Sequence, residues 1–113
     1  MDDIHLFEYH DVFSIYAALQ LEAAGFTAKG RGWKLAADGE IGRNGRIPSA
    51  TMGGMKARGF PGGAAGVYQA VEAVAQLRGR AEANQIPDAK TALVQSLGGP
   101  ASTAVSHILQ RLD

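Results

Sequence analysis

The most informative stretch of the 113-residue chain is GGMKARGFPGGAAG, which runs from Gly53 to Gly66 and leads directly into a helical pattern. A glycine-rich loop before a helix presents free backbone N–H groups and a partial positive charge, which suit anions, carbonyl oxygens and thioester oxygens. The spacing alone leaves open an alternative, in which small residues are needed because a helix and a sheet pack closely. The stretch lacks the Gly-Lys-Ser/Thr of a P-loop and the Gly-x-Gly-x-x-Gly of a dinucleotide site.

The residues before this stretch predict a strand, a helix and a long loop. Residues 4–9 are rich in aromatic and branched side chains, which is typical of a strand. Asp11 suits a helix N-cap, apolar residues follow it at helical spacing, and Gly25 stands where such a helix would end. Most of the 15 glycines lie in residues 26–66, so we expect a shaped, glycine-rich loop region there rather than a packed element.

The residues after the stretch predict a helix and a hairpin. Val67, Val71 and Val74 share one face of the predicted helix, and we expect this valine stripe to lie in the core. Residues 91–94 and 102–109 are expected strands, antiparallel because the Gly-Gly-Pro turn between them is short. The order strand–helix–loop–helix–strand–strand indicates the α/β class, with a mixed β-sheet covered by helices.

Length and composition set the limits of the function. The length supports a single domain over residues 1–113, and its thin core indicates that it needs a partner or further segments to be stable. The absence of cysteine excludes a disulfide scaffold, a cysteine-ligated metal and cysteine catalysis within this sequence. With 11 basic and 11 acidic residues, no nucleic-acid partner is expected. No apolar run is long enough for a membrane span and no leader opens the sequence, so a cytoplasmic location is expected.

Three blocks of sequence carry a family resemblance. They are EYHDVF at Glu8–Phe13, the stretch at Gly53–Gly66, and Leu97-Gly98-Gly99. In order and approximate spacing they resemble the C-terminal lobe of the thiolase superfamily. The resemblance is strongest to the sterol-carrier or lipid-transfer thiolases, which are acetyl-CoA acetyltransferase-like. That branch has a His-Asp-x-Phe block, a Gly-Gly-x-Lys-x-x-Gly-His-Pro-x-Gly-Ala-x-Gly block and a Gly-Gly turn.

The resemblance implies a fold, a substrate class and a partner. Thiolases have two duplicated halves, each with a five-stranded mixed sheet covered by helices, and they assemble as dimers or tetramers. Their nucleophilic cysteine lies in the N-terminal half, and the first strand of the C-terminal half precedes the region matched here. The resemblance therefore implies an incomplete thiolase-like C-terminal domain whose partner is an N-terminal half or larger subunit, with a homo-oligomer as a further possibility. The implied substrate is a coenzyme A thioester, with no permanently bound cofactor.

The resemblance also implies roles for individual residues, and departures from the family pattern alter them. His10 matches a histidine that binds the thioester oxygen, which is an oxyanion-hole role. Phe60 stands where the family has its catalytic histidine, and a phenyl ring cannot transfer a proton. Ser96 aligns with a second acid–base residue, a cysteine in typical members, and is a weak catalytic candidate without an adjacent base. Tyr9 is a second weak candidate, as a phenolic acid.

A wider group of residues is expected to contact the substrate or coenzyme A. These residues come from the glycine-rich stretch and the C-terminal turn: Gly53, Gly54, Lys56, Arg58, Gly59, Phe60, Gly98 and Gly99. For the two cations the alternative is a pair of solvated loop charges. The histidines at positions 5 and 107 are expected to be structural, and no spacing of metal ligands is visible.

Two functions follow as hypotheses. In the first, the chain is the C-terminal part of a thiolase-like enzyme acting on acyl-CoA thioesters by acyl transfer, thiolysis or retro-aldol carbon–carbon cleavage. It supplies an oxyanion-type histidine and a glycine-rich loop. In the second, the loss of two acid–base groups has left a catalytically silent scaffold or an acyl-CoA or lipid-binding module of the same fold.

Overall fold

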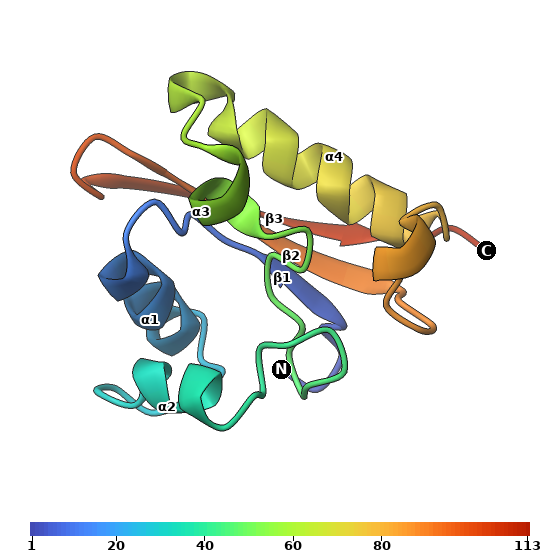
Figure 1. Ribbon diagram of the computed structural model, residues 1–113, viewed down its shortest axis with the longest axis horizontal. Helices are drawn as coiled ribbons and strands as arrows, with labels where there is room; N and C mark the ends of the chain where they lie inside the picture. The colour runs from blue at the N-terminus through green and yellow to red at the C-terminus, as the bar shows by residue number, and fades with distance from the viewer.

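The computed structural model describes residues 1–113 as a three-stranded sheet with helices on both faces (Figure 1). The elements in chain order are β1 (Leu6–Glu8), α1 (Ser14–Ala23), α2 (Gly32–Ala37), α3 (Gly54–Arg58), η1 (Gly62–Ala64), α4 (Ala65–Leu77), η2 (Glu82–Asn84), β2 (Thr91–Gly98) and β3 (Thr103–Gln110). The sheet order is β1-β2-β3, with β1 parallel and β3 antiparallel to β2. The predicted α/β class with a mixed sheet is confirmed.

Side chains that alternate along the strands build two separate cores. On one face, Phe7 and Tyr9 pack with Leu21 of α1 and Leu35 of α2. On the other face, Leu6 packs with apolar residues of α4 and β2. Because successive side chains of a strand point to opposite faces, Glu8 shares the α4 face with Leu6. The short strand β1 is therefore buried on both sides.

The glycine-rich region 26–66 is not loop throughout, which corrects the prediction. It contains α2 and α3, and the glycines permit close packing there. A Cβ on Gly32, the first residue of α2, would lie 2.1 Å from the backbone oxygen of Ala18 in α1. The two helices approach one another so closely that only glycine fits at this position. Glycine content alone does not distinguish a glycine needed for close helix packing from a glycine needed in a turn.

The first helix begins later than expected. Helix α1 starts at Ser14 with Phe13 at its N-cap, and no side chain caps it, so the prediction of Asp11 as its cap is wrong. Its end agrees with the prediction, because Gly25 follows the helix with φ of +82°. Only a residue without a Cβ adopts this conformation at low cost.

The valine stripe of α4 is exposed, which overturns its assignment to the core. Val67, Val71 and Val74 are 65%, 61% and 41% exposed. The buried face of the helix carries small and polar residues: Ala65, Gln69, Ala73, Gln76 and Leu77. Gln76 tolerates burial because its side chain accepts a hydrogen bond from Ile86 N and donates one to Asn84 O. Gln69 donates to Gln95 O, while its Oε1 has no partner. Helical spacing identified an apolar face but not which face the sheet covers.

The hairpin is longer than predicted and leaves an open edge. Strand β2 extends to Gly98, four residues beyond the expected end, and pairs along its whole length with β3. Strand β3 is the last strand of the sheet and is exposed at nearly every residue. An open edge of this length is a surface on which a further strand can pair. No helix is long and apolar enough to cross a membrane.

The contact between α1 and α2 gives a test of the fold. Replacing Gly32 by Ala places a methyl group against fixed backbone, and we expect the free energy of unfolding to fall by about 1–3 kcal/mol, the usual cost of overpacking. Urea denaturation measures this change. Gly63→Ala is the control, because a Cβ there would meet nothing within 4 Å. Equal stability of the two variants would contradict the described packing.

Candidate functional site

The end of β1 meets the glycine-rich stretch through Asp11. Its carboxylate accepts a hydrogen bond of 2.8 Å from Met55 N and a longer one of 3.4 Å from Lys56 N. These amides belong to the first turn of α3, where backbone N–H groups lack helical partners. Asp11 therefore caps α3 from a site 44 residues away along the chain, instead of capping α1.

The two glycines at the start of α3 make this contact possible. Gly54 has φ of +61°, and a Cβ on it would lie 2.3 Å from a carboxylate oxygen of Asp11. Gly53 has φ of +101°, and its Cβ would lie 2.5 Å from the side chain of Ala57. Both positions need glycine for conformation and for space. Their predicted contact with a substrate stays a prediction beside this structural role.

His10 is buried and firmly positioned. Its backbone N–H donates to the side-chain oxygen of Gln20, and its carbonyl accepts from the Gln20 amide, at 3.0 and 2.8 Å. The ring atom Nδ1 is buried without a hydrogen-bond partner. Burial lowers the pKa of His10, and the nearby Asp11 carboxylate opposes this shift. The imidazole is thus favoured in its neutral form, which has one N–H donor and one acceptor nitrogen.

Phe60 lies against His10. The two rings are edge-on, with centroids 5.5 Å apart and an interplanar angle of 78°. Phe60 is 55% exposed, so it covers the histidine on one side while its other side is open. The structure therefore brings together the oxyanion candidate and the residue that stands in place of a family histidine, although 50 positions separate them in the sequence.

Tyr9 lies on the opposite face of β1 from Glu8. Its ring packs on Phe7 at a centroid distance of 5.3 Å. Burial raises the pKa of Tyr9 to about 12, and the negative charges of Asp11 and Glu8 add to the effect. The phenol therefore keeps its proton near neutral pH. It is suited to donating a hydrogen bond and not to acting as a base.

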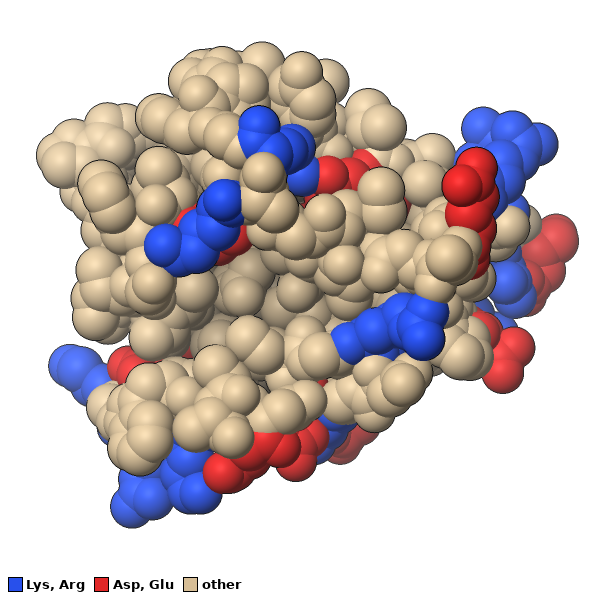
Figure 2. Space-filling model, in the orientation of Figure 1, with Lys and Arg blue, Asp and Glu red and all other residues tan.

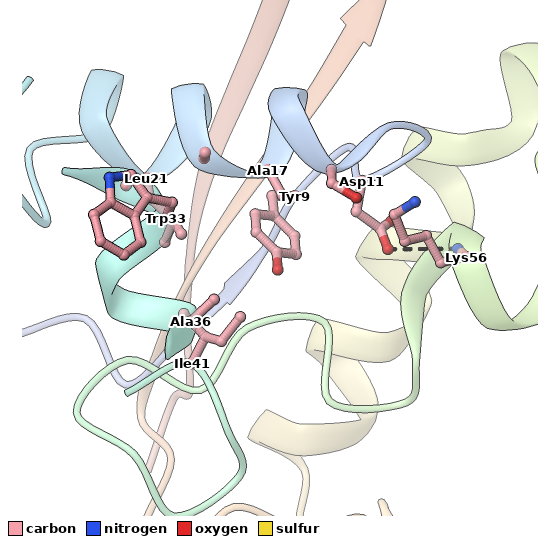
Figure 3. A pocket seen from close by; sticks show the side chains of 11 residues that line it. Tyr9, Asp11, Ala17, Leu21, Trp33, Ala36, Ile41 and Lys56 are labelled. Carbon is pink, nitrogen blue, oxygen red and sulfur yellow. Dashed lines mark hydrogen bonds between the residues drawn. The ribbon is translucent and has the colours of Figure 1, made fainter. Parts of the chain in front are cut away.

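A cavity of about 300 Å³ opens beside Tyr9 between α1 and α2 (Figure 3). Figure 3 shows Asp11 and Lys56 at one end, the Tyr9 hydroxyl pointing into the space, and the Trp33 ring at the other end. Most of the lining side chains are apolar. This volume is at the lower limit for a small-molecule site. The cavity was not predicted from the sequence, because residues 32–37 were expected to be loop. The single tryptophan, Trp33, was the only residue that pointed to an apolar contact there.

The two cations of the glycine-rich stretch have different surroundings. Arg58 forms an ion pair with Glu72 of α4, and its guanidinium lies 5.2 Å from the centre of the Tyr68 ring. Arg58 is therefore bound within the protein, unlike a solvated loop charge. Lys56 lines the cavity and forms no ion pair within the chain.

The C-terminal candidates lie on the hairpin. Ser96 of β2 faces the start of α4, where a Cβ on Gly66 would lie 3.2 Å from the serine hydroxyl. Gly98 ends β2, and Gly99 lies in the following turn with φ of +58°. Ser96 thus touches the end of the glycine-rich stretch. Its catalytic role stays a prediction, as does substrate contact by Gly98, Gly99 and Gly59.

The remaining polar groups include no set of metal ligands. His5 accepts a hydrogen bond from Thr91 N through Nδ1, in line with a structural role. No group of three or more His, Asp or Glu side chains is placed to hold a metal ion. Figure 2 shows charged side chains in small scattered groups around a hollowed, mostly uncharged surface. The site is therefore one of hydrogen bonds and apolar contact.

Comparisons with known proteins establish the family. Residues 1–111 match the family model described as thiolase C-terminal domain-like, and the chain belongs to this family. It is 45% identical over 109 residues to an acetyl-CoA acetyltransferase of Methanothermobacter thermautotrophicus, covering 96% of this chain and 28% of that protein. It is 39% identical over 97 residues to human sterol carrier protein 2, covering 86% of this chain and 18% of that protein.

A solved structure supports the same assignment. The Ltp2-ChsH2(DUF35) aldolase matches with a TM-score of 0.82 at 32% identity, covering 97% of this chain and 27% of that one. The predicted thiolase-like C-terminal fold is thus confirmed. The chain spans between 18% and 28% of the length of these relatives, which contain long regions without a counterpart here.

The Asp11 contact gives a test of the site geometry. Asp11→Ala removes the cap of α3, and we expect the free energy of unfolding to fall by about 0.5–2 kcal/mol, as for other N-cap losses. Asp38→Ala is the matched control, because Asp38 is half exposed and its pair with Lys34 contributes little. Urea denaturation compares the two. A loss at Asp11 no larger than that at Asp38 would contradict the capping role.

Proposed function

We propose that this member of the thiolase C-terminal domain-like family supplies His10 and the glycine-rich stretch to a site for acyl-CoA thioesters. The site would be completed by a thiolase-like N-terminal half or a larger subunit. The reaction would be an acyl transfer, a thiolysis or a retro-aldol cleavage of a carbon–carbon bond. The observation that carries the proposal is the buried His10 ring, held through its backbone and with Nδ1 unpartnered beside Phe60.

The chemistry of His10 fits an oxyanion site. A neutral imidazole donates one N–H, and a thioester carbonyl oxygen that gains negative charge strengthens this hydrogen bond. The lowered pKa of His10 is compatible with this role, because the neutral ring still carries one N–H donor. Phe60 cannot take part in proton transfer, so any acid or base at that step comes from elsewhere. The protonated phenol of Tyr9 is one candidate on this chain.

Two exposed surfaces support a partner. The valine stripe of α4 forms an apolar helix face open to solvent, beside Tyr68, which is 48% exposed. The edge of β3 is unpaired on the far side of the sheet. The regions of the relatives that this chain does not span would cover both surfaces. A second copy of the chain is the alternative occupant.

The second hypothesis also has a specific observation in its favour. Two family acid–base positions hold Phe60 and Ser96, while the apolar cavity beside Tyr9 is present. A domain of this kind would bind an acyl-CoA or a lipid without converting it. Titration of the chain alone with a fatty acyl-CoA distinguishes the enzyme hypothesis from the silent module. Micromolar binding by the chain, together with no turnover in any complex, favours the silent module.

Removing the His10 imidazole tests the proposed role directly. In the complex purified from the source cells, we expect His10→Ala to lower kcat with acyl-CoA substrates by about 10²–10³-fold, the usual cost of losing an oxyanion donor. Phe60→Ala should retain most of the activity, since Phe60 transfers no proton. His107→Ala on exposed β3 is the control. Equal activity with and without the His10 imidazole would contradict the oxyanion role of His10.

The exposed face of α4 tests the partner. Val71→Glu places a carboxylate in the apolar stripe, and we expect association with the larger chain to weaken by about tenfold or more, because burying an unpaired charge costs more than roughly 1.4 kcal/mol. Ala37→Glu, at an exposed position of α2 across the sheet, adds the same charge as a control. Native mass spectrometry measures both. Undiminished association of the Val71 variant would rule out this face as the interface.

A further inference from the structure

The cavity between α1 and α2 contains a hydrogen-bond donor that its other lining residues do not use. Tyr9 is only 6% exposed, and its hydroxyl points into the cavity (Figure 3). Figure 3 shows no hydrogen bond from this hydroxyl to any other residue that lines the cavity. Buried polar groups of native proteins almost always have a partner, because leaving one without a partner is costly. The partner of Tyr9 is therefore whatever molecule occupies the cavity.

The rest of the lining favours an apolar occupant over water. Leu21 of α1 and Ile41 contribute apolar surface, and the Trp33 ring lies at the end of the cavity away from Asp11. A buried water molecule needs about two to four polar partners, and most of this lining offers none. An apolar molecule, in contrast, removes the lining side chains from water on binding.

The polar end of the cavity disfavours an anion. Asp11 and Lys56 lie together at this end, and Ser14 is the only other polar lining residue besides Tyr9. A ligand carboxylate would be attracted by the ammonium of Lys56 and repelled by the carboxylate of Asp11. Asp11 is buried and Lys56 is exposed, so the repulsion is the less screened of the two. A neutral polar group avoids this repulsion.

The volume of the cavity limits the size of the ligand. At about 300 Å³ it is roughly twice the size of an engineered apolar cavity that binds benzene, so about ten non-hydrogen atoms fit. We propose that the α1–α2 cavity is a binding site for a neutral carbonyl compound of this size. Its alkyl or aryl body contacts the apolar lining, and its carbonyl oxygen accepts a hydrogen bond from the Tyr9 hydroxyl. Because burial raises the pKa of Tyr9 to about 12, the phenol remains a donor near neutral pH.

This site is separate from the one proposed at His10. The His10 ring contacts Phe60, and neither residue lines the cavity. The inference gives the silent-module hypothesis a ligand class and a location, but it rests on the cavity and not on thioester chemistry. Its test measures binding of a molecule without coenzyme A, so a negative result leaves the role of His10 untouched. Loss of the His10 role likewise leaves this site untouched.

Trp33 makes occupancy of the cavity measurable. It is the only tryptophan of the chain, and its ring lies at the cavity. Incorporation of 5-fluorotryptophan therefore gives one ¹⁹F NMR signal from the full chain, alone or with an unlabelled partner. We expect 2-octanone, a neutral ketone of suitable size, to shift this signal saturably with a dissociation constant of about 0.1–1 mM, as for other ligands this small. Octanoate, which has a similar chain and a negative charge, should bind more weakly.

Two pairs of variants locate the ligand. Tyr9→Phe removes the hydroxyl and keeps the ring, and we expect 2-octanone to bind about three- to tenfold more weakly, the usual effect of losing one hydrogen bond. Tyr16→Phe removes a hydroxyl outside the cavity and should bind as the wild type does. Ala36→Phe places a ring in the cavity and should abolish the saturable shift. Ala37→Phe, at an exposed position of the same helix that does not line the cavity, should retain it.

Three outcomes would overturn the proposal. A shift that rises linearly with 2-octanone and never saturates would show that the cavity does not bind it. Equal binding by Tyr9→Phe and the wild type would exclude the hydroxyl as the donor. Tighter binding of octanoate than of 2-octanone would make this a site for anions. If Ala36→Phe does not fold, the comparison of Tyr9→Phe with Tyr16→Phe still decides.

Discussion

The hydrogen bonds from the amides of Met55 and Lys56 to the Asp11 carboxylate connect the segment after β1 to the start of α3. Asp11 follows β1 and α3 begins the crossing to the other face of the sheet, so this contact fixes the glycine-rich stretch relative to the strand end. His10 is next to the capping residue and Phe60 follows the capped helix. Their ring contact therefore depends on the position of α3, and through it on one carboxylate.

Close approach imposes the second constraint, and it explains the glycine content better than flexibility does. Gly54 admits the Asp11 carboxylate, Gly53 admits Ala57, and Gly32 admits the backbone of α1. Gly54 and Gly32 thus leave out a Cβ where segments distant in sequence meet, and Gly53 does so for a residue one turn further along the chain. Several other glycines, such as Gly30 and Gly39, have open space around them and adopt positive φ angles at turns. The same residue type thus serves packing at some positions and chain reversal at others.

The family, the fold class and the antiparallel pairing of the hairpin could be predicted from the sequence, because motif blocks and turn residues act locally. The helix that Asp11 caps could not be predicted, since a carboxylate that suits an N-cap does not specify which helix it caps. The sequence did not show that the valines of α4 face outward, since small residues and bonded glutamines fill the buried face as well as apolar ones do. The cavity beside Tyr9 was equally hidden, because it exists only through the packing of α2 on α1.

Under the proposed function, His10 would bind and polarise the substrate carbonyl. Phe60 offers no acid or base, and burial lowers the pKa of the histidine. Yet Nδ1 is left buried without a partner, which costs about 1–3 kcal/mol in a folded protein. Packing alone gives no reason to keep such a group, because an apolar side chain of similar size would fill the space without that cost. Gln20 holds the backbone of His10 in place, and under the proposed function the unpartnered ring nitrogen would bond a polar atom of the ligand.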